Sequence, residues 1–439
     1  MSALRLAAVT LIVVAVAGSS GAGATTRSDA PLLTFNMGPG FLGLCATDLQ
    51  GHTFRLTDPR QPGVYLSWSP DGSQLVFRSD SSSVSFVDAE GHNRGILRWP
   101  SGDGENNSTD ISGLAWSPDS RSLAGALVTS YHYGGVRSEL WVNRGRTQTL
   151  YHGGLIGQPS WSPDGSRIAF SDRSTRKAYV IDQDGRNLRK VLDSANQPVW
   201  SPDGEWLAYI VLDEGGQSTG LAVARADGSS QRRLTDGNVL APAWSPDGST
   251  IAFTRNLGGP SQIDVIKPDG TDVRTVARGA MGFPGPVWSP DGGAIAYARQ
   301  EEPMGIGVVS PDGTNERIVE TGLPGASLSF PAWRRSAPLP THRRRCVVTG
   351  TARADVLRGK SRGDVLYGGG GDDRIYGAGG KDVLIGGSGH DRLLGGPGND
   401  LFKARDAKRD YLFGGPGWDR GTYDLYRDKT KSVERYDTD

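Results

Sequence analysis

Short apolar runs separated by turns recur along most of the chain, and their length predicts β-strands. Three of them, residues 168–170, 207–209 and 251–253, each follow closely after the same turn sequence, Pro-Asp-Gly. Proline presets the backbone of such a turn and glycine accepts a positive φ, so the chain reverses direction there. Strands joined by tight turns form hairpins, and the pattern therefore predicts an all-β fold.

The turn belongs to a longer repeat, Trp-Ser-Pro-Asp-Gly. Successive tryptophans are 48, 45, 39, 44, 44 and 45 residues apart. A unit of this length is typical of a four-stranded propeller blade, which cannot bury both of its faces alone. The motif resembles the TolB-type β-propeller repeat, and the resemblance covers residues 31–335. The repeats start at Trp68, Trp116, Trp161, Trp200, Trp244 and Trp288, and Trp333 starts a broken copy.

The two ends of this region predict a closed ring. Residues 32–35, 42–46 and 54–57 have the pattern of the second, third and fourth strands of a blade that lacks its first. Residues 330–333 supply a first strand with nothing after it. Joining the two ends completes a seventh blade and leaves no open sheet edge, so we predict seven blades, with six as the alternative.

A second repeat, nine residues long, begins at Gly350 and keeps its register as far as Lys403. Its sixth place is always aspartate and its eighth is a large apolar residue, while glycines dominate the first four places. Glycine allows backbone angles that other residues avoid, and it lets carbonyl oxygens turn inward. The six aspartates are Asp355, Asp364, Asp373, Asp382, Asp391 and Asp400.

This pattern is similar to the RTX calcium-binding nonapeptide. The resemblance implies a parallel β-roll in which two repeats make one turn, and in which Ca²⁺ is held by aspartates two repeats apart and by glycine-loop carbonyls. Carboxylates stacked about 4.8 Å apart repel each other unless a cation lies between them, and all-oxygen sites suit calcium. A solvated Gly-Asp surface without metal is the alternative. With two repeats per turn, one edge of the roll is lined by Asp355, Asp373 and Asp391, and the other edge by Asp364, Asp382 and Asp400.

The roll departs from the consensus at both ends. Thr351, Arg353, Lys360 and Arg362 replace glycines in the first two repeats, so we expect weak or empty sites there. One residue is inserted after Lys403, and residues 424–439 are charged and lack the repeat, which suits a polar cap.

The first 24 residues have the pattern of a signal peptide: a basic start, an apolar run over residues 6–17 and the small residues 22–24. An uncleaved anchor is the alternative, but the run is short for a membrane span. We expect a propeller over residues 25–335, a solvated basic linker over 336–345 and the roll over 346–439.

Only two cysteines are present, Cys45 and Cys346. Two cysteines exclude a thiolate zinc cage. In an oxidising compartment they predict one disulfide, between the start of the first domain and the start of the second. Two free buried thiols are the alternative.

Basic and acidic residues balance at 48 each, which argues against nucleic acid and anionic membranes as partners. We predict a monomeric, secreted calcium-binding protein whose propeller is a non-catalytic platform for an unknown protein or glycan. The repeated Trp and Asp positions are explained by architecture, so no catalytic or cofactor-binding residue is assigned, and Ca²⁺ is the only cofactor. The alternatives are an extracellular hydrolase or lactonase with a site at the channel mouth, and a calcium-dependent surface-layer or matrix component.

Overall fold

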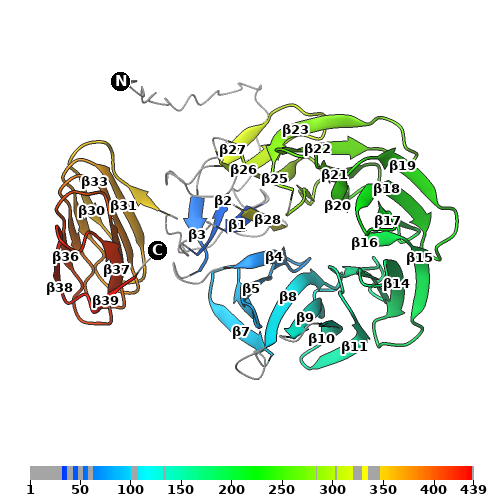
Figure 1. Cartoon of the computed structure of the whole chain (residues 1–439), viewed down its shortest axis with the longest axis horizontal. Helices are drawn as coiled ribbons and strands as arrows, with labels where there is room; N and C mark the ends of the chain where they lie inside the picture. The colour runs from blue at the N-terminus through cyan, green and yellow to red at the C-terminus, as the bar shows by residue number, and fades with distance from the viewer. Residues whose placement is uncertain are drawn as a thin grey trace, which may run out of the picture.

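The structure is a computed structural model that describes residues 32–36, 43–47, 53–57, 63–99, 107–131, 135–282, 284–301, 304–319, 329–334 and 347–437. Its regular elements are all β-strands, with no helix in these ranges. The predicted signal peptide, the predicted linker and Cys346 lie outside them. The described chain forms a ring of antiparallel sheets and a separate parallel solenoid, shown on the right and left of Figure 1.

Five four-stranded sheets and one eight-stranded sheet make up the ring, and each first strand faces its centre (Figure 1). The eight-stranded sheet is joined by a single residue pair, Ala280 with Arg299. The strands of the first two sheets are β28 (Ser329–Arg334), β1 (Leu32–Asn36), β2 (Leu44–Thr47) and β3 (Thr53–Arg55), and β4 (Val64–Trp68), β5 (Gln74–Asp80), β6 (Ser83–Asp88) and β7 (Asn93–Arg98).

The other sheets repeat this arrangement in chain order. They contain β8 (Asn107–Trp116), β9 (Leu123–Tyr131), β10 (Val136–Asn143), β11 (Thr147–Gly153); β12 (Ser160–Trp161), β13 (Arg167–Asp172), β14 (Lys177–Asp182), β15 (Arg189–Asp193); β16 (Ala195–Trp200), β17 (Trp206–Leu212), β18 (Ser218–Arg225), β19 (Arg232–Asp236); and β20 (Val239–Trp244), β21 (Ile251–Arg255), β22 (Ser261–Ile266), β23 (Arg274–Ala280), β24 (Val287–Trp288), β25 (Ile295–Arg299), β26 (Gly305–Val309), β27 (Arg317–Val319).

The two ends of the ring meet in one sheet. β28 pairs antiparallel with β1, and Leu33 lies opposite Trp333. The strand that follows the last complete repeat therefore provides the first strand of the sheet that begins the chain, as the sequence predicts.

The repeated tryptophans link neighbouring sheets. Their indole N–H groups donate to a backbone carbonyl of the preceding sheet, immediately before that sheet's own tryptophan, at 3.0 to 3.1 Å. Trp68 instead donates to the Thr34 hydroxyl at 2.9 Å. The donors to carbonyls are Trp116, Trp161, Trp244, Trp288 and Trp333.

The serine and aspartate of the motif hold its turn. In the turn after Trp161, the Ser162 hydroxyl donates to Asp164 at 2.5 Å and accepts the Arg167 N–H at 2.9 Å. The hydrogen bond from Ser162 is the main cause that lowers the pKa of Asp164 to about 2. Both side chains form hydrogen bonds within the turn, so this structural role accounts for their presence in the repeats.

The solenoid consists of two parallel sheets whose strands pair 18 residues apart, which is two repeats per turn. The eighth-place residues point inward and form one buried core, which includes Leu366, Leu384 and Phe402. One sheet contains β29 (Val348–Thr349), β31 (Val365–Gly370), β33 (Val383–Ser388), β35 (Leu401–Ala404), β37 (Arg420–Tyr423) and β39 (Arg435–Tyr436). The other contains β30 (Val356–Arg358), β32 (Arg374–Tyr376), β34 (Arg392–Leu394), β36 (Tyr411–Phe413) and β38 (Lys429–Lys431).

The C-terminal segment, expected to be a polar cap over residues 424–439, contains two short strands with mostly exposed residues. Its strands β38 and β39 pair in parallel with β36 and β37, so the spiral continues to the end of the described chain. Pairing between parallel strands needs only extended backbone, so it continues here without the glycines of the consensus.

The ring and the solenoid share a buried apolar cluster. Phe35 and Trp333 from the ring belong to the same cluster as Val365 and Val383 from the solenoid. Beside it, Arg55 at the end of β3 pairs with Asp364 at 3.2 Å and also donates to the Gly363 carbonyl. Cys45 on the neighbouring strand β2 is disulfide-bonded.

We expect Arg55→Met to destabilise the protein by about 3 kcal/mol or more, because it leaves the buried Asp364 carboxylate without its cation. The control is Arg94→Met, which removes an exposed arginine from its pair with Asp88 and should cost about 1 kcal/mol at most. Thermal or urea unfolding in saturating calcium measures both. Equal losses for the two variants would contradict the structural role of the Arg55 contact.

Candidate metal centre

The structure arranges the six predicted aspartates in two ladders. In each ladder the backbone N–H of one aspartate donates to Oδ1 of the aspartate 18 residues later. The bonds from Asp355 to Asp373 and from Asp373 to Asp391 measure 2.8 Å each. Those from Asp364 to Asp382 and from Asp382 to Asp400 measure 2.6 and 2.8 Å. The two sets are those that the repeat predicts.

Both ladders continue beyond the predicted residues. Asp391 donates to Asp410 at 2.7 Å and Asp400 donates to Asp419 at 2.6 Å, now 19 residues apart. Asp410 in turn donates to Asp428. The inserted residue after Lys403 shifts the spacing by one, which places these carboxylates outside a strict nine-residue pattern. The Gly-Gly-x-Gly-x-Asp pattern, which resumes at residues 414–419 after the insertion, is the feature of the sequence that could have located them.

The second carboxylate oxygen of one ladder has no hydrogen-bond partner within the described chain. This holds for Oδ2 of Asp373, Asp391 and Asp410, all of which are buried. A buried carboxylate oxygen without a donor is costly, because it has lost its water and gained nothing in return. Its position requires a cation or a proton.

The glycine loops bring further oxygens to the same place. A side chain at Gly368 would collide with both Oδ2 of Asp373 and the Gly386 carbonyl. The equivalent glycine of the next repeat, Gly377, faces Oδ2 of Asp382 and the Gly395 carbonyl in the same way. Carboxylate and carbonyl oxygens are the ligands that Ca²⁺ prefers. The donors present therefore fit calcium.

Positive φ angles keep these loops open. Gly369, Gly371, Gly387 and Gly389 have φ between 91° and 145°, which residues with a Cβ rarely adopt. Among the described residues no group of three or more His, Cys, Asp or Glu side chains could hold a metal ion. The carbonyl oxygens of Gly386 and Gly395, which lie beside the ladder carboxylates, are further oxygen ligands available there.

The first two repeats differ from the rest. Asp355 accepts hydrogen bonds from the Thr351 N–H and hydroxyl, at 2.7 and 2.8 Å, and these lower its pKa. Asp364 accepts the Lys360 N–H at 2.6 Å and pairs with Arg55. The residues that replace glycine thus coincide with carboxylates that protein donors already satisfy.

Further along, burial raises the pKa of the ladder carboxyls. The pKa of Asp391 rises to about 6 and that of Asp410 to about 7, first through burial and then through the neighbouring aspartates. The pKa of Asp382 rises to about 7 for the same reasons, partly offset by a backbone hydrogen bond and by Arg55. The ionised aspartates of one buried file thus repel each other, which contributes to their raised pKa values.

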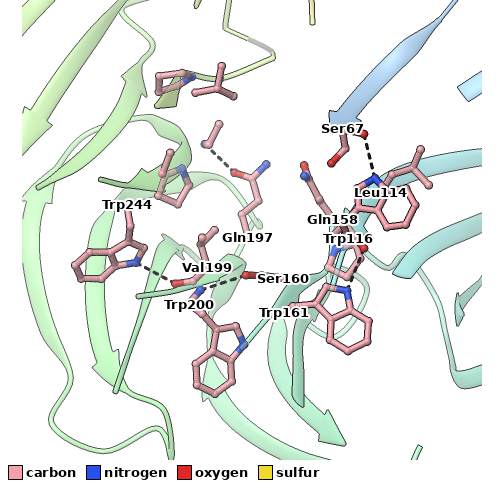
Figure 2. A pocket seen from close by; sticks show the side chains of 18 of the residues that line it. Ser67, Leu114, Trp116, Gln158, Ser160, Trp161, Gln197, Val199, Trp200 and Trp244 are labelled. Atoms are coloured by element: carbon pink, nitrogen blue, oxygen red, sulfur yellow. Dashed lines mark hydrogen bonds between the residues drawn. The ribbon is translucent and has the colours of Figure 1, made fainter. Parts of the chain in front are cut away.

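The ring contains a cavity of about 690 Å³, bounded by its innermost strands. Tryptophans and prolines of the repeated motif line it together with other prolines and small residues, and the described residues that line it include no Asp, Glu, His, Lys or Arg. Figure 2 shows the amide side chains of Gln158 and Gln197 extending into it. Its surface is therefore neutral and largely apolar, with a few hydrogen-bonding groups.

Some residues of the cavity wall have a strained backbone. Tyr65, Gln197 and Ala241, each three residues before a repeated tryptophan, have φ of 55°, 49° and 50°. The strand register shifts at each of these positions, and Oε1 of Gln197 accepts the Ala241 N–H at 2.9 Å. Non-glycine residues in this conformation cluster at functional sites more often than elsewhere.

Family comparisons match both parts. The TolB beta propeller domain matches residues 193–332, and the RTX calcium-binding nonapeptide repeat matches residues 349–384 and 376–402. The chain joins a TolB-like propeller to RTX repeats. RTX repeats bind calcium and are typical of extracellular proteins. Among curated proteins, none matches this sequence.

Solved structures resemble the propeller in fold. An oligogalacturonate lyase in complex with manganese has a TM-score of 0.51 at 18% identity, over 61% of this chain and 82% of that chain. TolB from Acinetobacter baumannii has a TM-score of 0.43 at 18% identity, over 70% and 83% of the two chains. These similarities concern the propeller architecture. Within the described residues, no helix is long and apolar enough to cross a membrane.

The raised pKa values predict opposite pH dependences with and without calcium. In chelator, a carboxyl whose pKa is raised by folding stabilises the solenoid at low pH and loses that contribution as the pH rises through about 6 to 7. The calcium-sensitive unfolding transition should therefore shift downward between pH 5 and pH 8 in EGTA.

With calcium, protons and metal compete for the same oxygens, so calcium affinity should increase over the same pH range. Thermal unfolding at several pH values, with EGTA and with calcium, measures both trends. A chelated solenoid that is more stable at pH 8 than at pH 5 would contradict the buried-carboxylate account.

Proposed function

We propose that this chain is a secreted protein whose solenoid is folded by calcium and whose propeller binds a partner without catalysis. The observation that carries the calcium role is the set of buried Oδ2 atoms of Asp373, Asp391 and Asp410, which have no hydrogen-bond partner in the described chain. Ca²⁺ would supply the positive charge that lets the ladder carboxylates stay ionised next to each other.

The proposed ligands are the six repeat aspartates with the carbonyl oxygens of the glycine loops that face them. Asp373, Asp382, Asp391 and Asp400 are the fully buried members. Asp355 and Asp364, whose carboxylates already accept protein donors, would bind calcium more weakly. Asp410 and Asp419 extend the same geometry and join the proposed set.

Export of the chain would fit the same account. Calcium is plentiful outside cells, where an affinity as weak as about 10⁻⁴ to 10⁻³ M suffices. We propose cleavage of a signal peptide over residues 1–24, a propeller over 25–335, a linker over 336–345 and the solenoid over 346–439. Before export the solenoid would lack metal and stay loosely folded, and it would close once calcium binds.

The propeller would act as the binding platform. We propose seven blades, with the eight-stranded sheet counted as two. Its neutral cavity of about 690 Å³ suits an uncharged ligand, and Gln158 and Gln197 would orient that ligand through hydrogen bonds. A loop of a protein partner or a neutral glycan has this chemistry.

Asp391→Asn tests the metal role. At pH 8 we expect the calcium concentration needed to stabilise the solenoid to rise about tenfold, because a ligand charge is lost. Stability in EGTA should not fall, because a buried like charge is removed and Asn can still accept the Asp373 N–H at Oδ1. Calcium titration followed by thermal unfolding measures both quantities.

The matched control is Asp372→Asn, an exposed carboxylate one turn earlier whose Oδ1 accepts the N–H of His390, the residue next to Asp391. It should leave the calcium dependence nearly unchanged. If Asp391→Asn loses stability equally in EGTA and in calcium, the carboxylate has only a packing role and the metal proposal is wrong.

Gln158→Trp tests the platform, because the larger side chain would fill the cavity. The wild-type protein is first screened on peptide and neutral-glycan arrays in millimolar calcium. We expect the variant to lose the signals that the wild type gives, at unchanged thermal stability. Gln217→Trp, on an exposed hairpin, is the control and should retain them. Equal binding by both variants would place the site elsewhere.

A further inference from the structure

The two outward faces of the solenoid have opposite character. On β31, β33 and β35, the seventh-place residues Val365, Val383 and Leu401 are only 1%, 0% and 7% exposed, and they belong to the cluster shared with the propeller. On β30, β32 and β34 the same place holds Val356, which is 57% exposed, and two exposed arginines. One face is therefore a domain contact and the other is open.

We call the open surface the outer face and define it by the five strands β30, β32, β34, β36 and β38. In Figure 1, β36 and β38 lie on the side of the solenoid away from the propeller. These strands contain five lysines and arginines, all exposed, and no aspartate or glutamate. The cations are Arg358, Arg374, Arg392, Lys429 and Lys431.

None of these five cations forms a salt bridge with a carboxylate of the described chain. The charges that most affect the pKa of Asp373 and Asp391 are those of other aspartates. The outer-face cations therefore do not serve as the main counter-ions of the calcium ladder. The chain has no net charge, so this cationic sheet face is a local feature. Its cations are available to pair with an external anion.

Aromatic rings lie between the cations. The Arg358 guanidinium lies 4.3 Å from the centre of the Tyr376 ring, and Arg392 and Lys429 lie 5.7 and 5.6 Å from that of Tyr411. Phe413 on the same face is 41% exposed. Parallel strands lie about 4.8 Å apart and align these groups in two mixed files. The first file is Val356, Arg374, Arg392, Tyr411 and Lys429, and the second is Arg358, Tyr376, Leu394, Phe413 and Lys431.

We propose that the outer face binds a linear acidic polysaccharide. A sugar ring can pack on the exposed Phe413, while carboxylate or sulfate groups pair with the guanidinium and ammonium groups that lie over Tyr376 and Tyr411. A polymer that carries both anionic groups and apolar sugar faces matches two files in which cations and aromatic rings are interspersed. This site is separate from the neutral propeller cavity, but it depends on the folded solenoid and so rests on the proposed calcium role.

Two other polyanions fit this surface less well. Readout of duplex DNA requires an element that enters a groove, such as a helix or a two-stranded ribbon, and the outer face is a flat sheet. Stable membrane attachment requires an inserted amphipathic helix or a lipid chain in addition to basic residues, and the described residues contain no helix.

The test measures binding of the full chain in millimolar calcium to hyaluronan, with neutral dextran as the reference polymer. We expect hyaluronan to bind and dextran not to bind, and we expect affinity to fall steeply with salt. Arg374→Gln combined with Arg392→Gln should weaken hyaluronan binding about tenfold or more, because two charge-assisted contacts are lost.

The matched control is Arg186→Gln combined with Arg189→Gln, two exposed arginines of the propeller, which changes the net charge equally. It should alter affinity less than about twofold. Calcium-dependent unfolding of both double variants shows that the solenoid is intact. Equal binding by both double variants, equal binding of dextran, or tighter binding of duplex DNA or anionic phospholipid vesicles would overturn the proposal.

Chelation separates this inference from the proposed function. If EGTA abolishes both the solenoid transition and hyaluronan binding, both proposals stand. If the solenoid stays folded in EGTA and still binds hyaluronan through Arg374 and Arg392, the calcium role fails while the outer-face site stands. If calcium folds the solenoid and hyaluronan does not bind, the outer-face proposal alone fails.

Discussion

The solenoid depends on carboxylates that are part of the backbone hydrogen-bond network. After the first aspartate of each file, every ladder aspartate uses Oδ1 to accept the N–H of the aspartate one turn earlier, so it cannot leave the interior without breaking the ladder. The same side chain carries a charge that burial penalises, and Oδ2 of Asp373, Asp391 and Asp410 finds no donor in the described chain. The hydrogen bonds at Oδ1 hold the carboxylates in place, while burial and mutual repulsion disfavour their negative charges. A cation between the carboxylates compensates those charges without moving them.

The first carboxylate of each file is stabilised by groups of the protein. Asp364 opens its file, and there the propeller residue Arg55 supplies a permanent positive charge to the carboxylate. Asp355 opens the other file and is satisfied by Thr351. Protein donors therefore satisfy the carboxylates where the consensus glycines are missing. The propeller contact and the departures from consensus thus have one electrostatic explanation.

The regular parts of this structure could be predicted because they follow fixed periods. The nine-residue repeat gave the two aspartate ladders, and the pairing of residues 330–333 with the first strand followed from the order of strands within one repeat. Asp410 and Asp419 were not in the predicted set because one inserted residue changes the spacing from 18 to 19. The Arg55 contact spans 309 positions and belongs to no period, so only the folded chain reveals it.

A strand of three residues in the solenoid has one inward and two outward positions. The core constrains the inward eighth place of the repeat, and the ladder constrains the aspartate at the sixth place. The seventh and ninth places can vary without disturbing the core or the ladder. In this chain one outward sheet face uses that freedom for Val365 and Val383, which pack in the cluster shared with the propeller. The other uses it for Arg374 and Arg392, which face solvent. Positions outside the repeat consensus are therefore where one calcium-binding scaffold acquires its individual contacts.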